Sequence, residues 1–211
     1  MLKFRGILFA VTACFVQFQC IEAFAGVEAE VRDISGGKYF DAVHLAFQNA
    51  ENSIYVAMYD IRVYPDRKSG PHYRLLLDLV AAHKRGVKVK VYLDRSESTD
   101  QHTGEAIVHD GNAVAYGILR DAGVDVRYVV ATQRLHAKLI VIDERTVVES
   151  SANWSFSALT ENAESGTMII SQQYAMIKLQ WIWALKLQKD ADKPAGGKNS
   201  RRDRAKKDKP E

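Results

Sequence analysis

Two side chains that could meet an anion stand at the start of an apolar run in the second half of the chain. His136 and Lys138 are two residues apart, the run 139–142 follows, and Asp143 closes it. A short apolar run rich in β-branched residues is typical of a strand buried on both faces. Because alternate side chains of a strand share a face, His136 and Lys138 point the same way and Asp143 points the other way. An imidazole beside an ammonium needs polar partners, which favours an anion site over a core position.

A second polar pair, Ser151 and Asn153, follows with the same spacing of two. Together the five identities resemble the signature of the phospholipase D superfamily, which reads His-x-Lys, four residues, Asp, six residues, Gly-Ser-x-Asn. Ser150 stands where the family usually has Gly, and this departure removes no functional side chain. The resemblance covers roughly residues 30–190, a typical length for one domain. It is nearest to the small single-motif bacterial endonucleases of the superfamily, which are secreted or periplasmic.

The resemblance implies a phosphodiester reaction in two steps. One histidine attacks phosphorus to form a phosphohistidine, and a second histidine protonates the leaving oxygen and later activates water. His136 is the motif histidine, Lys138 and Asn153 would hold the phosphoryl oxygens, and Ser151 would assist them. The six histidines show no His-x-His or His-Glu-x-x-His spacing, so the sequence predicts neither a metal nor another cofactor.

Two acidic residues near the motif receive supporting roles. A catalytic histidine needs a carboxylate that fixes its tautomer. Asp143 lies on the wrong face of an ideal strand for this task, so we expect it to accept backbone or hydroxyl hydrogen bonds near the site. Glu164 matches a Glu that small relatives of the family carry at about this place, and it is the expected partner of His136. The alternative for Glu164 is an exposed acid at a helix end.

The chain carries one copy of the motif, whereas the implied mechanism needs two histidines. Long members of the family carry two copies, so the resemblance implies that a short member forms a homodimer about a twofold axis. The final helix, with Trp181 and Trp183, is expected either to line that interface or to pack in the core.

Three functions fit this motif. The first is a sequence-nonspecific endonuclease that acts on DNA, with RNA left open as a second substrate. The second is a phospholipase D or phosphatidyl-transfer enzyme, which should show apolar loops around the site, whereas residues 94–111 are polar. The third is a noncatalytic nucleic-acid-binding protein with a relic site, and the intact His136, Lys138 and Asn153 argue against it.

The pattern of apolar residues predicts an α/β fold with a mixed sheet layered between helices. Polar loops are expected at 59–71 and 94–111. The expected helices are 41–52, 72–85, 112–122, 154–162 and 174–189, and the expected strands are 27–34, 53–58, 87–93, 124–130, 135–143, 146–149 and 166–171.

The two ends of the chain differ from the domain at 26–189. Residues 1–25 have a basic start, an apolar stretch and small residues at the end, which predicts a cleaved secretory signal rather than a transmembrane anchor. We therefore expect a periplasmic or secreted protein without stable membrane insertion. Residues 190–211 are expected to be disordered, and with Lys189 they carry a net charge of +4. This tail would act either as a solubilising end or as a tether for nucleic-acid phosphates.

Overall fold

The computed structural model describes residues 26–64, 68–100 and 102–188. Within these residues the main element is a mixed sheet of seven strands in the order β1-β9-β8-β7-β2-β3-β6. The strands β2, β3 and β6 are parallel, and β7, β8, β9 and β1 extend the sheet through antiparallel pairings. Their bounds are β1 (Glu30–Asp33), β2 (Ser53–Met58), β3 (Lys88–Leu93), β6 (Asp125–Tyr128), β7 (Lys138–Ile142), β8 (Thr146–Ser150) and β9 (Gly166–Ile170).

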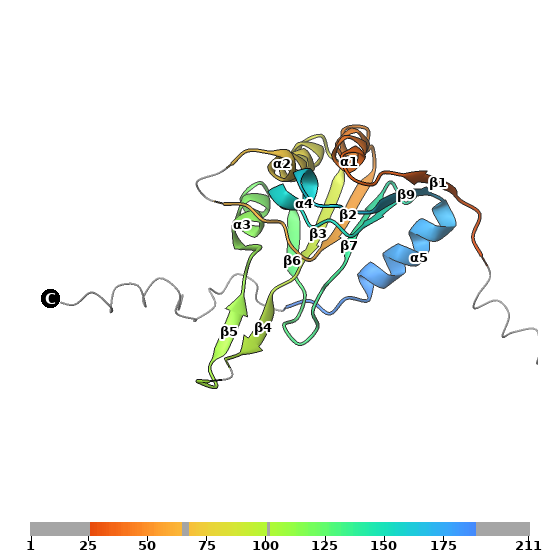
Figure 1. Ribbon diagram of the computed structural model, residues 1–211. Coiled ribbons are helices and arrows are strands. Elements are labelled where there is room, and N and C mark those ends of the chain that lie inside the picture. The colour runs from red at the N-terminus through yellow and green to blue at the C-terminus, as the bar shows by residue number, and fades with distance from the viewer. Residues whose placement is uncertain (1–25, 65–67, 101, 189–211) are drawn as a thin grey trace, which may run out of the picture.

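Helices cover both faces of the sheet, which confirms the expected α/β fold. Four helices lie on one face and α5 lies on the other (Figure 1). Every residue of β2 is buried, because its alternate side chains enter two separate cores. Val56 packs on the side of the four helices and Tyr55 packs on the side of α5. The helices are α1 (Lys38–Gln48), α2 (Pro71–Lys84), α3 (Ala113–Asp121), α4 (Phe156–Thr160) and α5 (Gln172–Trp183).

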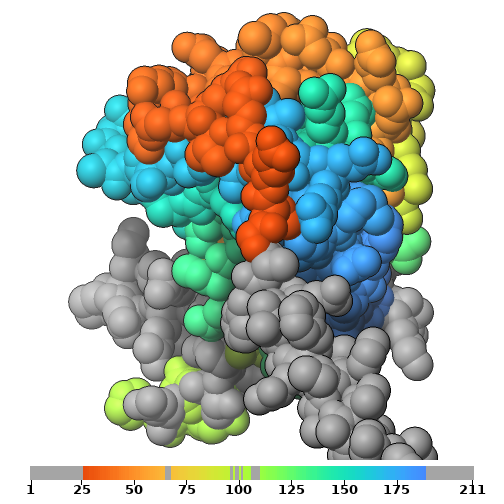
Figure 2. All heavy atoms as spheres, turned by 90° about the vertical axis from the view of Figure 1, so that its right-hand side faces the viewer, coloured from red at the N-terminus to blue at the C-terminus, as the bar shows by residue number. Residues whose placement is uncertain are grey.

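The last helix buries one stripe and leaves two large aromatic side chains outside. Ala175, Leu179 and Ile182 are buried against the sheet. Trp181 and Trp183 are 45% and 51% exposed, so neither is a core residue. Figure 2 shows that β1 lies at the surface beside α5. The expected core packing of the final helix therefore holds for this stripe and not for the two tryptophans, whose role at an interface stays a prediction.

Two expected elements differ from the structure. The segment 94–111, expected to be irregular, contains an antiparallel hairpin of β4 (Ser96–Thr99) and β5 (Ala106–His109), which projects from the body in Figure 1. The sequence does not reveal this pairing, because each strand has only four residues, too few to show a clear alternation of apolar and polar side chains. The final helix ends at Trp183 instead of residue 189, since residues 186–188 turn to pair with the end of β6.

Both chain ends lie outside the described residues. The expected signal at 1–25 and the expected tail at 190–211 therefore stay predictions. Among the described helices, none combines the length and the apolar character that crossing a bilayer requires.

A buried amide joins the loops that follow two neighbouring strands. Asn112, which precedes α3 and is 2% exposed, accepts a hydrogen bond from the Ile61 N–H at 2.7 Å. Its Nδ2 donates to the carbonyl oxygens of Tyr59 at 2.9 Å and Asp94 at 2.8 Å. Since these backbone groups are shielded from water, one side chain satisfies three groups that would otherwise be costly.

The contribution of Asn112 to stability can be tested by Asn112→Ala. Removing the amide leaves a buried N–H and two carbonyls without their partner, so the free energy of unfolding should fall by about 2–4 kcal/mol. Urea unfolding measures it, and Asn49→Ala, at an exposed asparagine, serves as the control. Equal stability of the two variants would contradict the role given to Asn112.

Candidate active site

The motif residues meet at one edge of the sheet. Met58, the last residue of β2, pairs with Lys138, the first residue of β7. β8 ends at the same edge, where Ser150 pairs with Gly166 of β9. Residues far apart in sequence are thus brought together by strand register.

His136 and Lys138 are joined by the ring of Tyr59. β7 begins at Lys138, so His136 lies in the extended segment just before the strand, and its side chain is exposed. The rings of Tyr59 and His136 have centroids 4.6 Å apart, and Lys138 Nζ lies 5.1 Å from the Tyr59 centroid. Lys138 Nζ also donates to the His136 carbonyl oxygen at 3.1 Å. These contacts place the ammonium and the imidazole on the same aromatic support.

Asn153 presents an amide whose oxygen has no partner. Its Oδ1 is buried without a hydrogen bond, and no described hydrogen bond uses its Nδ2. The next residue, Trp154, is fully buried and donates its backbone N–H to the Asp60 carbonyl oxygen at 2.9 Å and its indole N–H to Tyr39 Oη at 3.1 Å. Burial of the indole therefore fixes the backbone that carries Asn153. An unpaired buried polar atom at a rigid position is typical of a functional site.

Ser150 replaces the family glycine without strain. Among the described non-glycine residues, positive φ occurs only at Asp143 and Glu144, so position 150 has no need of glycine. The Ser150 hydroxyl donates to the Ser165 carbonyl oxygen at 2.8 Å and accepts from the Ala152 N–H at 3.0 Å. The substitution thus adds local hydrogen bonds beside the motif.

Glu164 lies beside Ser151. The Ser151 hydroxyl donates to Glu164 Oε2, the Asn162 amide donates to Oε1 at 3.1 Å, and the Ser165 N–H donates to Ser151 Oγ at 3.0 Å. Among the described residues no hydrogen bond joins Glu164 to His136. The orienting role of Glu164 toward His136 therefore stays a prediction, while its contact with Ser151 is a structural fact.

The charge of Lys138 is set by opposing effects. Burial is the larger one, and it lowers the pKa of Lys138 below the ordinary 10.5. The carboxylates of Glu164 and Asp60 act in the opposite direction and favour the ammonium. Two acids on one cation keep the site from carrying a large excess of positive charge before an anion binds.

Asp143 does not join the other motif residues. It follows β7 five residues after Lys138, which places it about 17 Å along the strand from that residue. Its carboxylate accepts backbone hydrogen bonds from Glu51, Asn52 and Ser53 at 3.1, 2.7 and 2.8 Å. The expectation of backbone hydrogen bonds is met, but their expected place near the site is wrong, because the strand separates its two ends.

Residues that the motif does not include also build this edge. Tyr59 supports His136 and Lys138, Asp60 lies near Lys138, and Arg62 pairs with Asp60 at 2.7 Å. Asp94 is 4% exposed and accepts from the Leu135 N–H at 2.8 Å, which holds the start of the motif segment. The sequence could have indicated Tyr59 and Asp94 by their positions. Each directly follows a buried parallel strand, and ligand-binding residues gather at these strand ends in α/β sheets.

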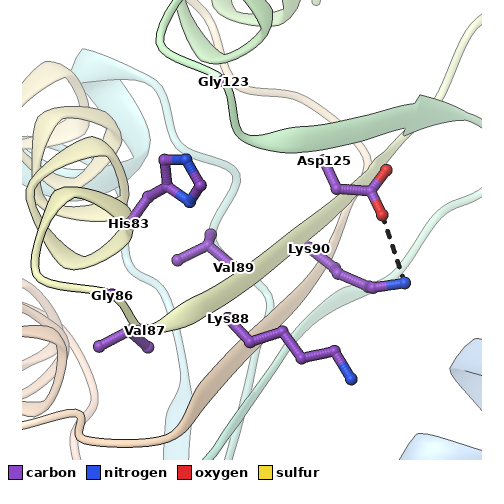
Figure 3. A pocket seen from close by; sticks show the side chains of 8 residues that line it. All are labelled: His83, Gly86, Val87, Lys88, Val89, Lys90, Gly123 and Asp125. Carbon is purple, nitrogen blue, oxygen red and sulfur yellow. Dashed lines mark ion pairs between the residues drawn. The ribbon is translucent and has the colours of Figure 1, made fainter.

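A hollow of about 300 Å³ lies elsewhere on the molecule. Figure 3 shows His83, Lys88 and Lys90 around it, with Lys90 paired to Asp125 at 3.3 Å. Lys88 begins β3, whereas the motif residues lie beyond the other end of that strand, about 17 Å away. The hollow is therefore not part of the motif site.

The assembled groups match the needs of a phosphodiester. An exposed imidazole can attack phosphorus or move a proton, and an ammonium and an amide can bind non-bridging oxygens. His136, Lys138 and Asn153 supply these groups on one surface, with Ser151 next to them.

Comparisons with known proteins agree with this geometry. Residues 44–184 match the family described as cardiolipin synthase, PLD-like domain. The chain is 27% identical over 166 residues to the DISARM protein DrmC of Bacillus paralicheniformis, covering 77% of this chain and 62% of that protein. It is 30% identical over 133 residues to phospholipase D of Rickettsia typhi, covering 63% of this chain and 55% of that protein.

The fold is shared with Nuc from Salmonella typhimurium, a phospholipase D family member, with a TM-score of 0.60 and 24% identity over 76% of this chain and 97% of that chain. The chain spans less than two thirds of the length of either curated relative. Because the family match extends over more than half of the sequence and includes the assembled motif, the chain belongs to the phospholipase D superfamily of phosphodiester-processing enzymes.

Proposed function

We propose that the protein is an endonuclease that hydrolyses nucleic-acid phosphodiester bonds without sequence preference and without a metal. The observation that supports it most is the group of polar side chains gathered at the strand ends. His136 is exposed, the Asn153 amide has no described partner, and none of the described ion pairs uses Lys138. A short chain with a single motif resembles the nucleases of the superfamily, in which contact with backbone phosphates gives cutting without base recognition.

The proposed reaction has two displacements. A ring nitrogen of His136 attacks phosphorus, the bond from phosphorus to the leaving oxygen breaks, and a second histidine gives that oxygen a proton. A water oxygen then attacks phosphorus and gives its proton to the second histidine, and the phosphorus–nitrogen bond breaks. Lys138 and Asn153 hold the non-bridging oxygens in both steps, and Ser151, held by Glu164, assists them.

The second histidine is proposed to come from a second copy of the chain. The other histidines whose side chains are described lie elsewhere: His44 contacts Asp78, His72 lies against Phe156, His83 borders the hollow of Figure 3, and His102 follows β4. A homodimer would bring two exposed His136 rings together about a twofold axis. Secretion to the periplasm or beyond the cell belongs to the same proposal.

A phospholipase D or phosphatidyl-transfer activity is the second candidate. It is favoured by the similarity to the phospholipase D of Rickettsia typhi. Against it stands the hairpin next to the site, since the turn residues His102, Thr103 and Glu105 are polar and exposed. A noncatalytic nucleic-acid-binding protein is the third candidate, and it offers no reason for the complete set of His136, Lys138 and Asn153.

Chelation gives the first test of the mechanism. Because cationic and amide donors take the place of a metal here, excess EDTA should leave plasmid nicking by the purified protein unchanged. His136→Ala prepared in parallel controls for a contaminating nuclease. Loss of nicking in EDTA and its return with a divalent ion would show that the metal-free mechanism is wrong.

The pKa of Lys138 predicts an alkaline fall in activity. Since burial lowers this pKa, the ammonium is lost on raising the pH at a value below 10.5, and phosphate stabilisation is lost with it. The slope of log kcat/KM against pH should therefore steepen by about one as the Lys138 ammonium is lost. Lys138→Arg stays charged and should not show this steepening, at a lower overall rate. A steepening that persists in Lys138→Arg would contradict this assignment.

Mixed dimers test the shared site. His136→Ala and His136→Asn should abolish turnover while the fold is retained, because neither side chain can attack phosphorus or carry the proton. When wild-type and His136→Ala subunits exchange, activity should fall as the square of the wild-type fraction, since heterodimers lack one histidine. A linear fall, or full activity from a protein that sediments as a monomer, would contradict the shared site.

A further inference from the structure

An extended segment leads away from the motif residues along the surface. Its side chains alternate, since Ile61 and Val63 are buried while Arg62 and Tyr64 are 44% and 45% exposed. Asp60 shares the outer side with Arg62 and Tyr64, because residues two apart in an extended chain face the same way. The outer side thus presents an acid, a cation and an aromatic ring in a row, with steps of about 6.6 Å.

Backbone hydrogen bonds fix this row against the motif. Ile61 and Trp154 form a parallel bridge, in which Trp154 N–H donates to the Asp60 carbonyl oxygen at 2.9 Å and Arg62 N–H donates to the Trp154 carbonyl oxygen at 2.8 Å. Trp154 directly follows Asn153. Arg62 therefore lies on a strand about 4.8 Å from the strand that carries the motif amide.

The ion pair of Asp60 and Arg62 links the row to Lys138. Arg62 Nη2 lies 2.7 Å from Asp60 Oδ2, and the same carboxylate acts on the Lys138 charge. Gly111 packs closely against one side of this ion pair. A Cβ at position 111 would lie 3.3 Å from Asp60 Oδ1 and 3.4 Å from Arg62 Nη2. The guanidinium is thus held in one place with its outer side open to solvent.

We propose that Arg62 binds the phosphate next to the scissile one and that Tyr64 stacks on the adjoining base, so that the substrate is a single-stranded polynucleotide. This inference rests on the proposed endonuclease function. Asp60 is shared between Arg62 and Lys138, and the half-exposed guanidinium of Arg62 can still accept a phosphate on its outer side. A guanidinium is suited to phosphate oxygens, and an exposed aromatic ring beside it is typical of single-strand binding. A lipid headgroup has no base to stack and would leave Tyr64 unused.

Two substrates separate this subsite from the reaction centre. Bis(4-nitrophenyl) phosphate has one phosphodiester and no neighbouring nucleotide, whereas a short single-stranded oligonucleotide has both. Arg62→Ala should raise KM for the oligonucleotide about tenfold and reduce the slope of log KM against log salt by about one. Tyr64→Ala should raise KM by a similar factor and Tyr64→Phe should not, since the ring stacks. Turnover of bis(4-nitrophenyl) phosphate should stay within about twofold in the two Tyr64 variants, and Arg62→Ala should lower it by a smaller factor than it lowers turnover of the oligonucleotide.

Arg32→Ala is the matched control, because Arg32 is also exposed and also pairs with an acid two residues earlier, Glu30, at 2.7 Å. This variant should turn over both substrates at the wild-type rate and with the wild-type KM. Arg62→Lys should keep the wild-type slope of log KM against log salt. KM for a duplex oligonucleotide should not change in Tyr64→Ala.

Several results would overturn the inference. One is an equal effect of Arg62→Ala and Arg32→Ala on KM for the oligonucleotide. A second is an equal loss of activity on both substrates in Arg62→Ala. A third is a loss of activity confined to phosphatidylglycerol vesicles, which would indicate a lipid site. If the wild-type protein turns over neither bis(4-nitrophenyl) phosphate nor oligonucleotide, the endonuclease proposal itself is wrong and the inference fails with it.

Discussion

The buried amide of Asn112 is the contact on which the geometry of the site depends. It binds backbone groups of the loops that follow β2 and β3, and β2 is the strand against which β7 pairs. Tyr59 then donates its N–H to the Ala137 carbonyl oxygen at 2.8 Å, and Ala137 lies between His136 and Lys138. The positions of His136 and Lys138 thus rest on hydrogen bonds of the buried Asn112 side chain, where a lost partner is expensive. A rigid edge of this kind places charged groups without cost at the moment of reaction.

Sequence reasoning reached the motif and the fold class, because both depend on local identity and periodicity. The strand at 53–58 and the spacing of His136, Lys138, Ser151 and Asn153 can be read directly from the residues. The location of Asp143 could not be read in this way, since spacing along a strand does not say which of its ends forms the site. The β4–β5 hairpin could not be predicted in this way, because strands of four residues are too short to show a clear alternation of apolar and polar side chains.

The charges at the site form a balance of acids and bases rather than a simple positive patch. Lys138 is pulled toward its neutral form by burial and toward its charged form by Glu164 and Asp60. Each of these acids also holds another group, Ser151 for Glu164 and Arg62 for Asp60. Tertiary structure sets this balance, since the acids come from segments about 100 residues apart. A purely local sequence pattern could identify Lys138 but not the two acids that raise its pKa.

The segment 186–188, which follows α5, covers part of an outer strand of the sheet and so bears on aggregation at high protein concentration. β6 is an outer strand of the sheet, and such a strand offers unpaired N–H and C=O groups to any other extended chain. Here Val130 N–H donates to the Lys186 carbonyl oxygen and Gln188 N–H donates to the Tyr128 carbonyl oxygen, each at 2.9 Å. The segment thus occupies the end of β6 with the protein's own backbone. At the opposite edge β1 carries charged side chains, so both borders of the sheet resist the strand-to-strand polymerisation that leads to fibres.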